Sequence, residues 1–203
     1  MIAILDYDAG NIKSVEKAIE YLGYEAVITR DRDIILDCDH VILPGVGSFG
    51  DAMNRLKEYK LDKVIYEVID NNTPFLGICL GLQLLYESSE ESPGVLGLGI
   101  LKGRILRIPD NYGLKIPHMG WNNLTIKENA SLFKGIENNP YVYFVHSYYL
   151  KASDEDEVCA VTDYSTVIHA SVEKNNIFAC QFHPEKSSTT GLKILKNFLE
   201  IPN

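Results

Sequence analysis

The chain has 203 residues, of which 46% are hydrophobic, and a formal net charge of -9 at pH 7. A chain of this size can bury one large core, so we expect a single domain over residues 1–203. The acidic balance argues against a broad nucleic-acid surface, because phosphate binding needs clustered lysine and arginine.

The first third alternates short apolar runs with amphipathic segments, which is typical of parallel strands joined by crossover helices. Its first apolar run, 1–5, is too short for a signal peptide, and the longest, 75–86, is too short and interrupted for a membrane span. Strands are predicted at 2–5, 26–29, 40–43 and 75–78. Helices are predicted at 11–22, 51–59, 61–69 and 80–87.

From residue 98 onward, closely spaced strand candidates rich in Tyr, Val, Ile and Phe replace this alternation. They lie at 100–108, 123–126, 141–145, 158–161, 167–172 and 177–182. A final amphipathic helix is predicted at 191–199. The fold class is therefore α/β, with an open, mostly parallel central sheet flanked by helices. The C-terminal half is expected to extend the same sheet with antiparallel strands.

The cysteines and histidines of the chain follow no metal-binding pattern. The four cysteines form no CxxC pair, and the five histidines form no HxxxH or HExxH motif. We therefore expect no metal, no cofactor and no disulfide framework. Reduced thiols and the lack of membrane segments favour a soluble, cytoplasmic protein.

The segment Gly77-Ile78-Cys79-Leu80-Gly81 lies between a predicted strand and a predicted helix. It is the cysteine form of the G-x-S-x-G nucleophile turn, in which side chains at the two glycine positions would collide with neighbouring backbone. Cys79 would then face a helix N-terminus, which favours its thiolate. A buried structural cysteine is the alternative, and the flanking glycines favour a nucleophile.

His183-Pro184-Glu185 follows the last predicted strand. Proline favours an extended conformation for His183, and a continued strand would place His183 and Glu185 on the same side. A carboxylate beside an imidazole can accept its second N–H and fix its tautomer. We therefore interpret His183 as the base for Cys79 and Glu185 as the residue that orients it, although a strand-end histidine beside an exposed glutamate is the commoner case.

The glycine-rich segment 44–47 follows the third predicted strand, where an open parallel sheet places ligand loops. Attack by Cys79 on an amide would create an oxyanion, and backbone N–H groups of Val46, Gly47 and Leu80 could stabilise it. An ordinary glycine-rich turn is an equally good interpretation of the loop alone. A phosphate loop fits less well, because no GxxxxGK[ST] motif occurs.

Five segments together resemble the class I glutamine amidotransferases, and within them the glutaminase subunits of histidine biosynthesis. They are PGVGSFGDAM, GICLGLQLLYESSEES, PHMGWN, YFVHSY and QFHPEKSS. The resemblance covers the whole chain and implies a flavodoxin-like fold without a fused synthase. It implies that Cys79, His183 and Glu185 hydrolyse glutamine through a thioester. It further implies substrate contacts from Gln83, Glu91, His146, Ser147 and Tyr148.

The same resemblance implies a partner, a (β/α)8-barrel synthase that uses the ammonia to convert PRFAR into imidazole glycerol phosphate and AICAR. The two chains would form a heterodimer, and the segment around the only tryptophan would face the partner. The matching positions are His118, Met119, Trp121, Asn122, Tyr143 and Lys186. From the residues alone, Trp121 is equally well explained as a core residue.

Two other functions remain open at this point. The first is a glutaminase subunit of another class I amidotransferase, serving anthranilate, pyridoxal phosphate or purine synthesis. PHMGWN speaks against it. The second is a non-catalytic binding or scaffold protein with a relic site, which is disfavoured by the presence of Cys79, His183 and Glu185.

Overall fold

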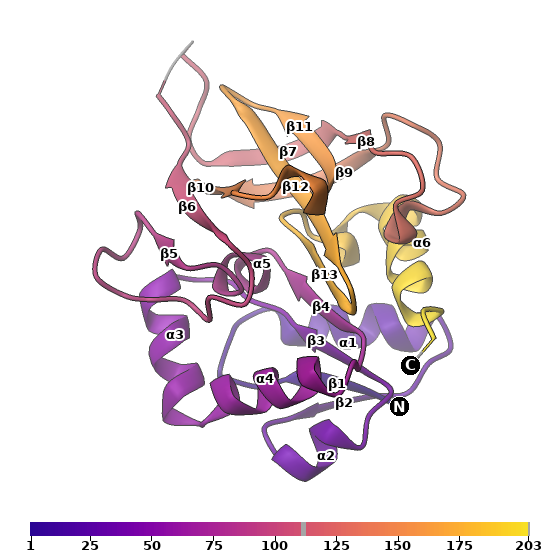
Figure 1. The fold of residues 1–203 in the computed structure, drawn as a ribbon. Coiled ribbons are helices and arrows are strands. Elements are labelled where there is room, and N and C mark those ends of the chain that lie inside the picture. The colour runs from indigo at the N-terminus through magenta and orange to yellow at the C-terminus, as the bar shows by residue number, and fades with distance from the viewer. Residues whose placement is uncertain (111–112, 203) are drawn as a thin grey trace.

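The computed structural model describes residues 1–110 and 113–202. Within them the central feature is an eight-stranded sheet (Figure 1). Across the sheet its strands are β2 (Ala26–Thr29), β1 (Ile2–Leu5), β3 (His40–Leu43), β4 (Phe75–Ile78), β13 (Ile177–Cys180), β12 (Val167–Lys174), β11 (Val158–Asp163) and β8 (Thr125–Ile126).

The sheet is parallel from β2 to β13 and antiparallel from there to β8. The strand β13 therefore joins the two halves, because it runs parallel to β4 and antiparallel to β12. This arrangement confirms the predicted α/β class with an antiparallel C-terminal extension.

The C-terminal strands do not all extend this sheet, which corrects the prediction of a single sheet. A three-stranded sheet pairs β10 (Tyr148–Ala152), β6 (Gly103–Arg107) and β5 (Ser88–Ser89), and a two-stranded sheet pairs β7 (His118–Asn123) with β9 (Tyr141–His146). The prediction was wrong because an apolar pattern identifies a strand but does not specify which strand it pairs with.

Helices cover both faces of the main sheet, with α3 (Phe49–Glu58) and α4 (Leu61–Asp70) on one side and α1 (Ile12–Tyr21) and α6 (Ser188–Leu199) on the other (Figure 1). Strand β1 shows why both faces need cover. Its side chains alternate, so Ala3 and Leu5 enter the core under α3 and α4, while Ile2 and Ile4 enter the core under α1 and α6. None of the helices in the described ranges is long and apolar enough to cross a membrane.

Several helices and strands in the structure differ from the predicted ones. The helix expected at 80–87 is α5 (Leu80–Leu84), because the backbone of Glu87 pairs with Gly103 and its carboxylate accepts the Gly103 N–H at 3.0 Å. These bonds draw the chain into β5. The strands β5, β7 and β10 and the short helix α2 (Arg32–Leu36) were not predicted, apart from the last residue of β7. The cap of α2 is Asp31, whose carboxylate accepts two backbone N–H groups.

Candidate active site

The candidate site lies where β3, β4 and β13 end. These strands are neighbours and run parallel, so their carboxyl ends meet at one edge of the sheet. The glycine-rich loop follows β3, Cys79 follows β4 and His183 lies shortly after β13. The topology thus brings together three segments that are far apart in the sequence.

The turn after β4 holds Cys79 in an unusual conformation, with φ 56° and ψ −106°. Such a backbone is costly for any residue with a side chain, and strain of this kind concentrates at functional sites. The two glycines have the predicted steric role. A Cβ on Gly77 would lie 2.8 Å from the carbonyl oxygen of Gly81, and a Cβ on Gly81 would lie 1.9 Å from that of Leu43.

His183 and Glu185 form a buried pair whose side chains are 2% and 0% exposed. His183 Nδ1 donates to Glu185 Oε1 at 2.8 Å. The route to this contact differs from the expected continuous strand. His183 is extended, but Pro184 begins a 3-10 turn, η3 (Pro184–Lys186), which brings the carboxylate back to Nδ1 of the ring. Proline at the first position of a turn favours this geometry because its φ is already fixed.

The second nitrogen of the His183 ring remains available. Within the described residues, His183 Nε2 is buried without a hydrogen-bond partner. Burial lowers the pKa of the imidazole, but interactions with the sulfur of Cys79 and with Glu185 outweigh that effect and raise the pKa to about 10. At neutral pH the ring therefore carries a proton that it can deliver to a leaving group.

This raised pKa predicts how stability changes with pH. The folded state holds the His183 proton more tightly than the unfolded chain, whose pKa is near 6.5. The stabilisation is complete below that value and is lost as pH rises toward about 10, at about 1.4 kcal/mol for each pH unit that separates the two pKa values. In urea unfolding, we expect the native protein to have a larger free energy of unfolding than His183→Gln. This difference should shrink as pH rises from 6.5 to about 10.

His169→Gln is the matched control for this measurement. Burial lowers the pKa of His169, so its contribution has the opposite sign and is lost as pH falls. A native advantage over His183→Gln that stays constant across the window would contradict the assigned charge state.

A cavity of about 330 Å³ opens beside Cys79. It brings together residues from four of the five segments singled out in the sequence. Its lining comprises Val46, Gly47, Cys79, Leu80, Gln83, Glu91, Pro117, Val145, His146, Ser147 and Tyr148. His183 and Glu185 are not among the residues that line this cavity. The proposed nucleophile therefore lines the cavity, and the buried histidine pair, whose ring interacts with Cys79, does not.

The glycine-rich loop is held from both sides. The hydroxyl of Tyr7 donates to the carbonyl of Pro44 at 2.7 Å, and the backbone N–H of Leu80 donates to the carbonyl of Gly45 at 3.3 Å. The N–H predicted to stabilise an oxyanion is therefore already paired. It becomes available only when Gly45 moves.

Glu91 connects the cavity to α3. Its carboxylate accepts the backbone N–H of Phe49 at 2.8 Å, and the adjacent Ser92 hydroxyl accepts that of Gly50 at 3.0 Å. The acidic segment at 90–92 thus satisfies the free N–H groups that begin this helix. Glu91 is fixed in place by this contact rather than loose on an acidic surface.

The residues expected to face a partner differ in their exposure to solvent. Met119 and Trp121 on β7 are 61% and 53% exposed, and the Trp121 ring meets Tyr143 edge-on at 6.1 Å. Asn122 is partly buried and Lys186 is exposed. His118 is only 3% exposed, which corrects its placement on the surface.

His118 is buried because it packs between two aromatic rings and pairs with a second buried histidine, His146. The His118 ring stacks between Phe144 and Tyr164, and its Nδ1 lies 3.0 Å from Nε2 of His146. His146 Nδ1 in turn lies 2.8 Å from the carbonyl of Tyr148, which can only accept. Burial lowers the pKa of both rings, to about 4 for His118 and about 3 for His146, so both are neutral.

Two side chains that contact Glu185 or Cys79 were missed. Asn11 donates to Glu185 Oε1 at 2.6 Å, and Gln181, which is 0% exposed, donates to the sulfur of Cys79 at 3.7 Å. Asn11 lies before α1, where the sequence pattern indicated only a helix start. Gln181 is a polar residue inside an apolar run, and that mismatch is the signal that could have revealed it.

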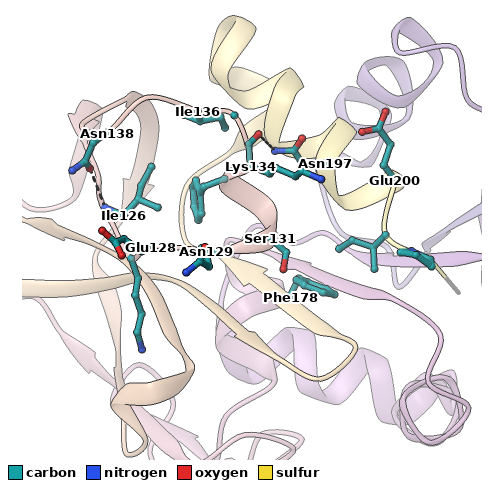
Figure 2. A pocket seen from close by; sticks show the side chains of 16 residues that line it. Ile126, Glu128, Asn129, Ser131, Lys134, Ile136, Asn138, Phe178, Asn197 and Glu200 are labelled. Atoms are coloured by element: carbon teal, nitrogen blue, oxygen red, sulfur yellow. Dashed lines mark hydrogen bonds between the residues drawn. The ribbon is translucent and has the colours of Figure 1, made fainter.

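A larger cavity of about 870 Å³ lies on another part of the molecule, between the segment 126–138 and the C-terminal helix (Figure 2). The described residues that line it include no histidine or cysteine. Nowhere in the described ranges are three or more His, Cys, Asp or Glu residues placed to hold a metal ion. The chemistry-bearing groups are therefore concentrated in the smaller cavity beside Cys79.

The model of the family "Glutamine amidotransferase class-I" matches residues 3–201. Among curated proteins, "Imidazole glycerol phosphate synthase subunit HisH" of Methanocaldococcus jannaschii is 49% identical, covering 99% of this chain and 100% of that protein. The protein of the same name from Caldanaerobacter subterraneus subsp. tengcongensis is 52% identical, covering 99% and 98%.

Solved structures share the fold at lower identity. One described as a glutamine amidotransferase has a TM-score of 0.76 at 20% identity and covers 98% of this chain and 97% of its own. A chain of PurLQS from Thermotoga maritima has a TM-score of 0.76 at 23% identity, with 98% and 96% covered. These two similarities establish the fold alone.

Proposed function

The chain belongs to the class I glutamine amidotransferase family, and from this premise we propose that Cys79, His183 and Glu185 are its catalytic triad. Its activity is hydrolysis of glutamine to glutamate and ammonia, as the glutaminase subunit of imidazole glycerol phosphate synthase in histidine biosynthesis. The observation that carries the triad assignment is a buried His183–Glu185 pair that interacts with a strained cysteine in the wall of a cavity.

The proposed reaction has two stages. The Cys79 thiolate attacks the side-chain amide carbon of glutamine, and His183 keeps the proton that the thiol has lost. The tetrahedral intermediate collapses when His183 protonates the amide nitrogen, so that ammonia leaves and a thioester remains. Water, deprotonated by His183, then cleaves the thioester. Glutamate leaves, its carboxyl proton passes to solvent, and the Cys79 thiolate and the protonated His183 are restored. Glu185 fixes the ring tautomer and stabilises the imidazolium throughout.

The residues that line the cavity are proposed to bind the substrate. Gln83, Glu91, His146, Ser147 and Tyr148 would hold glutamine, and the backbone N–H groups of Val46, Gly47 and Leu80 would stabilise the oxyanion. A carboxylate at position 91 suits the α-ammonium group of glutamine. The backbone of the segment 146–148 supplies both donors and acceptors for its α-carboxylate and ammonium.

We further propose that the chain forms a heterodimer with a (β/α)8-barrel synthase subunit, which uses the ammonia on PRFAR. Support comes from the exposed rings and apolar side chains of β7 and β9, where Met119, Trp121 and Tyr141 are each more than half exposed. This surface adjoins the site, because the strand β9 ends at His146 in the cavity wall. Ammonia could then pass to the partner without entering bulk water, where it would become ammonium.

Two broader assignments accompany the proposal. Residues 1–203 are taken as one glutamine amidotransferase domain, which the family match over 3–201 supports. The protein is placed in the cytoplasm, consistent with four free cysteines, all of them buried.

The proposal is tested by glutamate release from this chain alone and with the barrel subunit and its nucleotide. While Gly45 holds the N–H of Leu80, an oxyanion donor is missing. One such donor is worth about 3 kcal/mol, so we expect the complete system to be about 10²- to 10³-fold faster than the isolated chain. An isolated chain as fast as the complex would overturn the proposed dependence on the partner.

A second part of the same experiment tests whether the exposed residues of β7 and β9 bind the barrel subunit. Trp121→Ala should raise the barrel concentration needed for half-maximal activation by at least about tenfold. Tyr21→Ala removes an aromatic side chain that is 78% exposed on α1, and should leave that concentration unchanged. Equal effects of the two variants would place the partner elsewhere.

A further inference from the structure

Gln181 is a buried amide with no role in the two stages of the proposed reaction. It is 0% exposed and directly follows β13. Its Nε2 lies 3.7 Å from the sulfur of Cys79, within hydrogen-bonding range for sulfur, and its Oε1 lies 3.0 Å from Nε2 of Gln83. A fully buried polar side chain is costly unless its groups are paired, and both ends of Gln181 are paired with residues of the site.

The orientation of the Gln181 amide is determined by the backbone carbonyl of Tyr148, which acts through the side chain of Gln83. The carbonyl of Tyr148 can only accept, and it lies 3.0 Å from Gln83 Nε2, which must therefore be the amino group. That amino group also faces Gln181, so the Gln181 atom that meets it must be the oxygen. The Gln181 amino group is then directed at the sulfur of Cys79. A flipped amide would bring two donors together and lose both contacts.

The carbonyl of Tyr148 is itself held in position by two further interactions. His146 donates its Nδ1–H to the same Tyr148 carbonyl at 2.8 Å, so this oxygen accepts from two sides. The peptide also belongs to β10, which pairs with β6 beginning at Tyr148 and Arg107. Gln181 thus presents its donor to the sulfur from a preorganised position.

We propose that Gln181 is a further catalytic residue, whose side-chain N–H donates to the Cys79 sulfur and stabilises its negative charge. This inference rests on the proposed role of Cys79 as the nucleophile. A hydrogen bond to the charged form of a group favours that form. Gln181 supplies the effect without a charge of its own, so it leaves the His183–Glu185 pair unperturbed and does not need to move when the sulfur attacks.

The test measures alkylation of Cys79 by iodoacetamide as a function of pH, followed by mass spectrometry of its peptide. This readout needs no glutamine and no partner, so it is independent of whether the chain is a glutaminase. In Gln181→Met, which keeps the length but lacks the donor, we expect alkylation at neutral pH to be about threefold to tenfold slower and its midpoint to move to higher pH.

Two further variants keep the result interpretable. Gln181→Glu keeps the shape and places a carboxylate against the sulfur, so its alkylation should be slower still. Ser171→Ala removes another fully buried hydrogen bond of the same sheet, from its hydroxyl to the carbonyl of Ala179 at 2.8 Å, and should leave the pH profile unchanged. Profiles of Gln181→Glu or Gln181→Met that coincide with the native one, or that move to lower pH, would overturn the proposal. Slower alkylation with a midpoint at higher pH and normal folding by circular dichroism would support it.

Discussion

Replacement of Cys79 by alanine is expected to reduce glutamine hydrolysis by at least about 10⁴-fold in the complex with the barrel subunit. The thioester cannot form without the sulfur, and water is not positioned to take its place while His183 is directed at residue 79. Binding of glutamine should persist, because the cavity residues that would hold it are unchanged. The measurement is glutamate release under saturating glutamine and partner.

The control is Cys180→Ala. Cys180 ends β13 close to the site, is completely buried, and bonds through its sulfur to the carbonyl of Phe182 at 3.5 Å. It does not line the cavity, so the variant should keep activity within a few-fold and lose only some stability. Retained activity in Cys79→Ala would refute covalent catalysis and favour a non-catalytic role for this chain.

Gly81→Ala should destabilise the protein by more than about 3 kcal/mol. The added Cβ would lie 1.9 Å from the carbonyl oxygen of Leu43, an atom of the sheet backbone. Strand β3 is paired on both sides, with β1 and β4, and cannot move away without breaking those pairings. The free energy of unfolding in urea measures the effect.

Gly23→Ala is the matched control. Gly23 differs from Gly81 in having a positive φ, 87°, and a Cβ there would have no neighbour within 4 Å. Its replacement should cost only the backbone strain, about 1–2 kcal/mol. If both variants lose the same amount, close packing of the turn against β3 is not the reason for glycine at position 81.

The nucleophile turn could be predicted because its cause is local. Glycines at 77 and 81, an apolar strand before them and a helix after them suffice to indicate a sharp turn that projects Cys79. The contact between His183 and Glu185 was also predictable, but its geometry was not. Two residues separated by a proline can meet either along a strand or across a turn. The turn is favoured by Pro184 and is packed against α6, β9 and α1.

The features that were missed depend on segments far apart in the sequence. The burial of His118 requires Tyr164 on one face and Phe144 on the other, and the pairing of Leu80 with Gly45 requires β3 and β4 to be neighbours. Likewise, a polar residue inside an apolar run marks Gln181 as unusual, but nothing near it in the sequence indicates that its amide meets Cys79. Periodicity reports which side of a strand is buried, but it carries no information on what lies opposite.

The position of β13 between β4 and β12 has a consequence for how the chain acquires reactivity during folding. The nucleophile and its parallel strands belong to the first part of the chain, whereas Gln181, which contacts its sulfur, lies 102 residues further on. Insertion of β13 is a long-range event, and such contacts form slowly because a large loop must close first. A chain synthesised only as far as β12 therefore carries Cys79 without its proposed base, His183. On the proposed mechanism, the thiol becomes an efficient nucleophile only when β13 is in place, so such an incomplete chain lacks an activated sulfur.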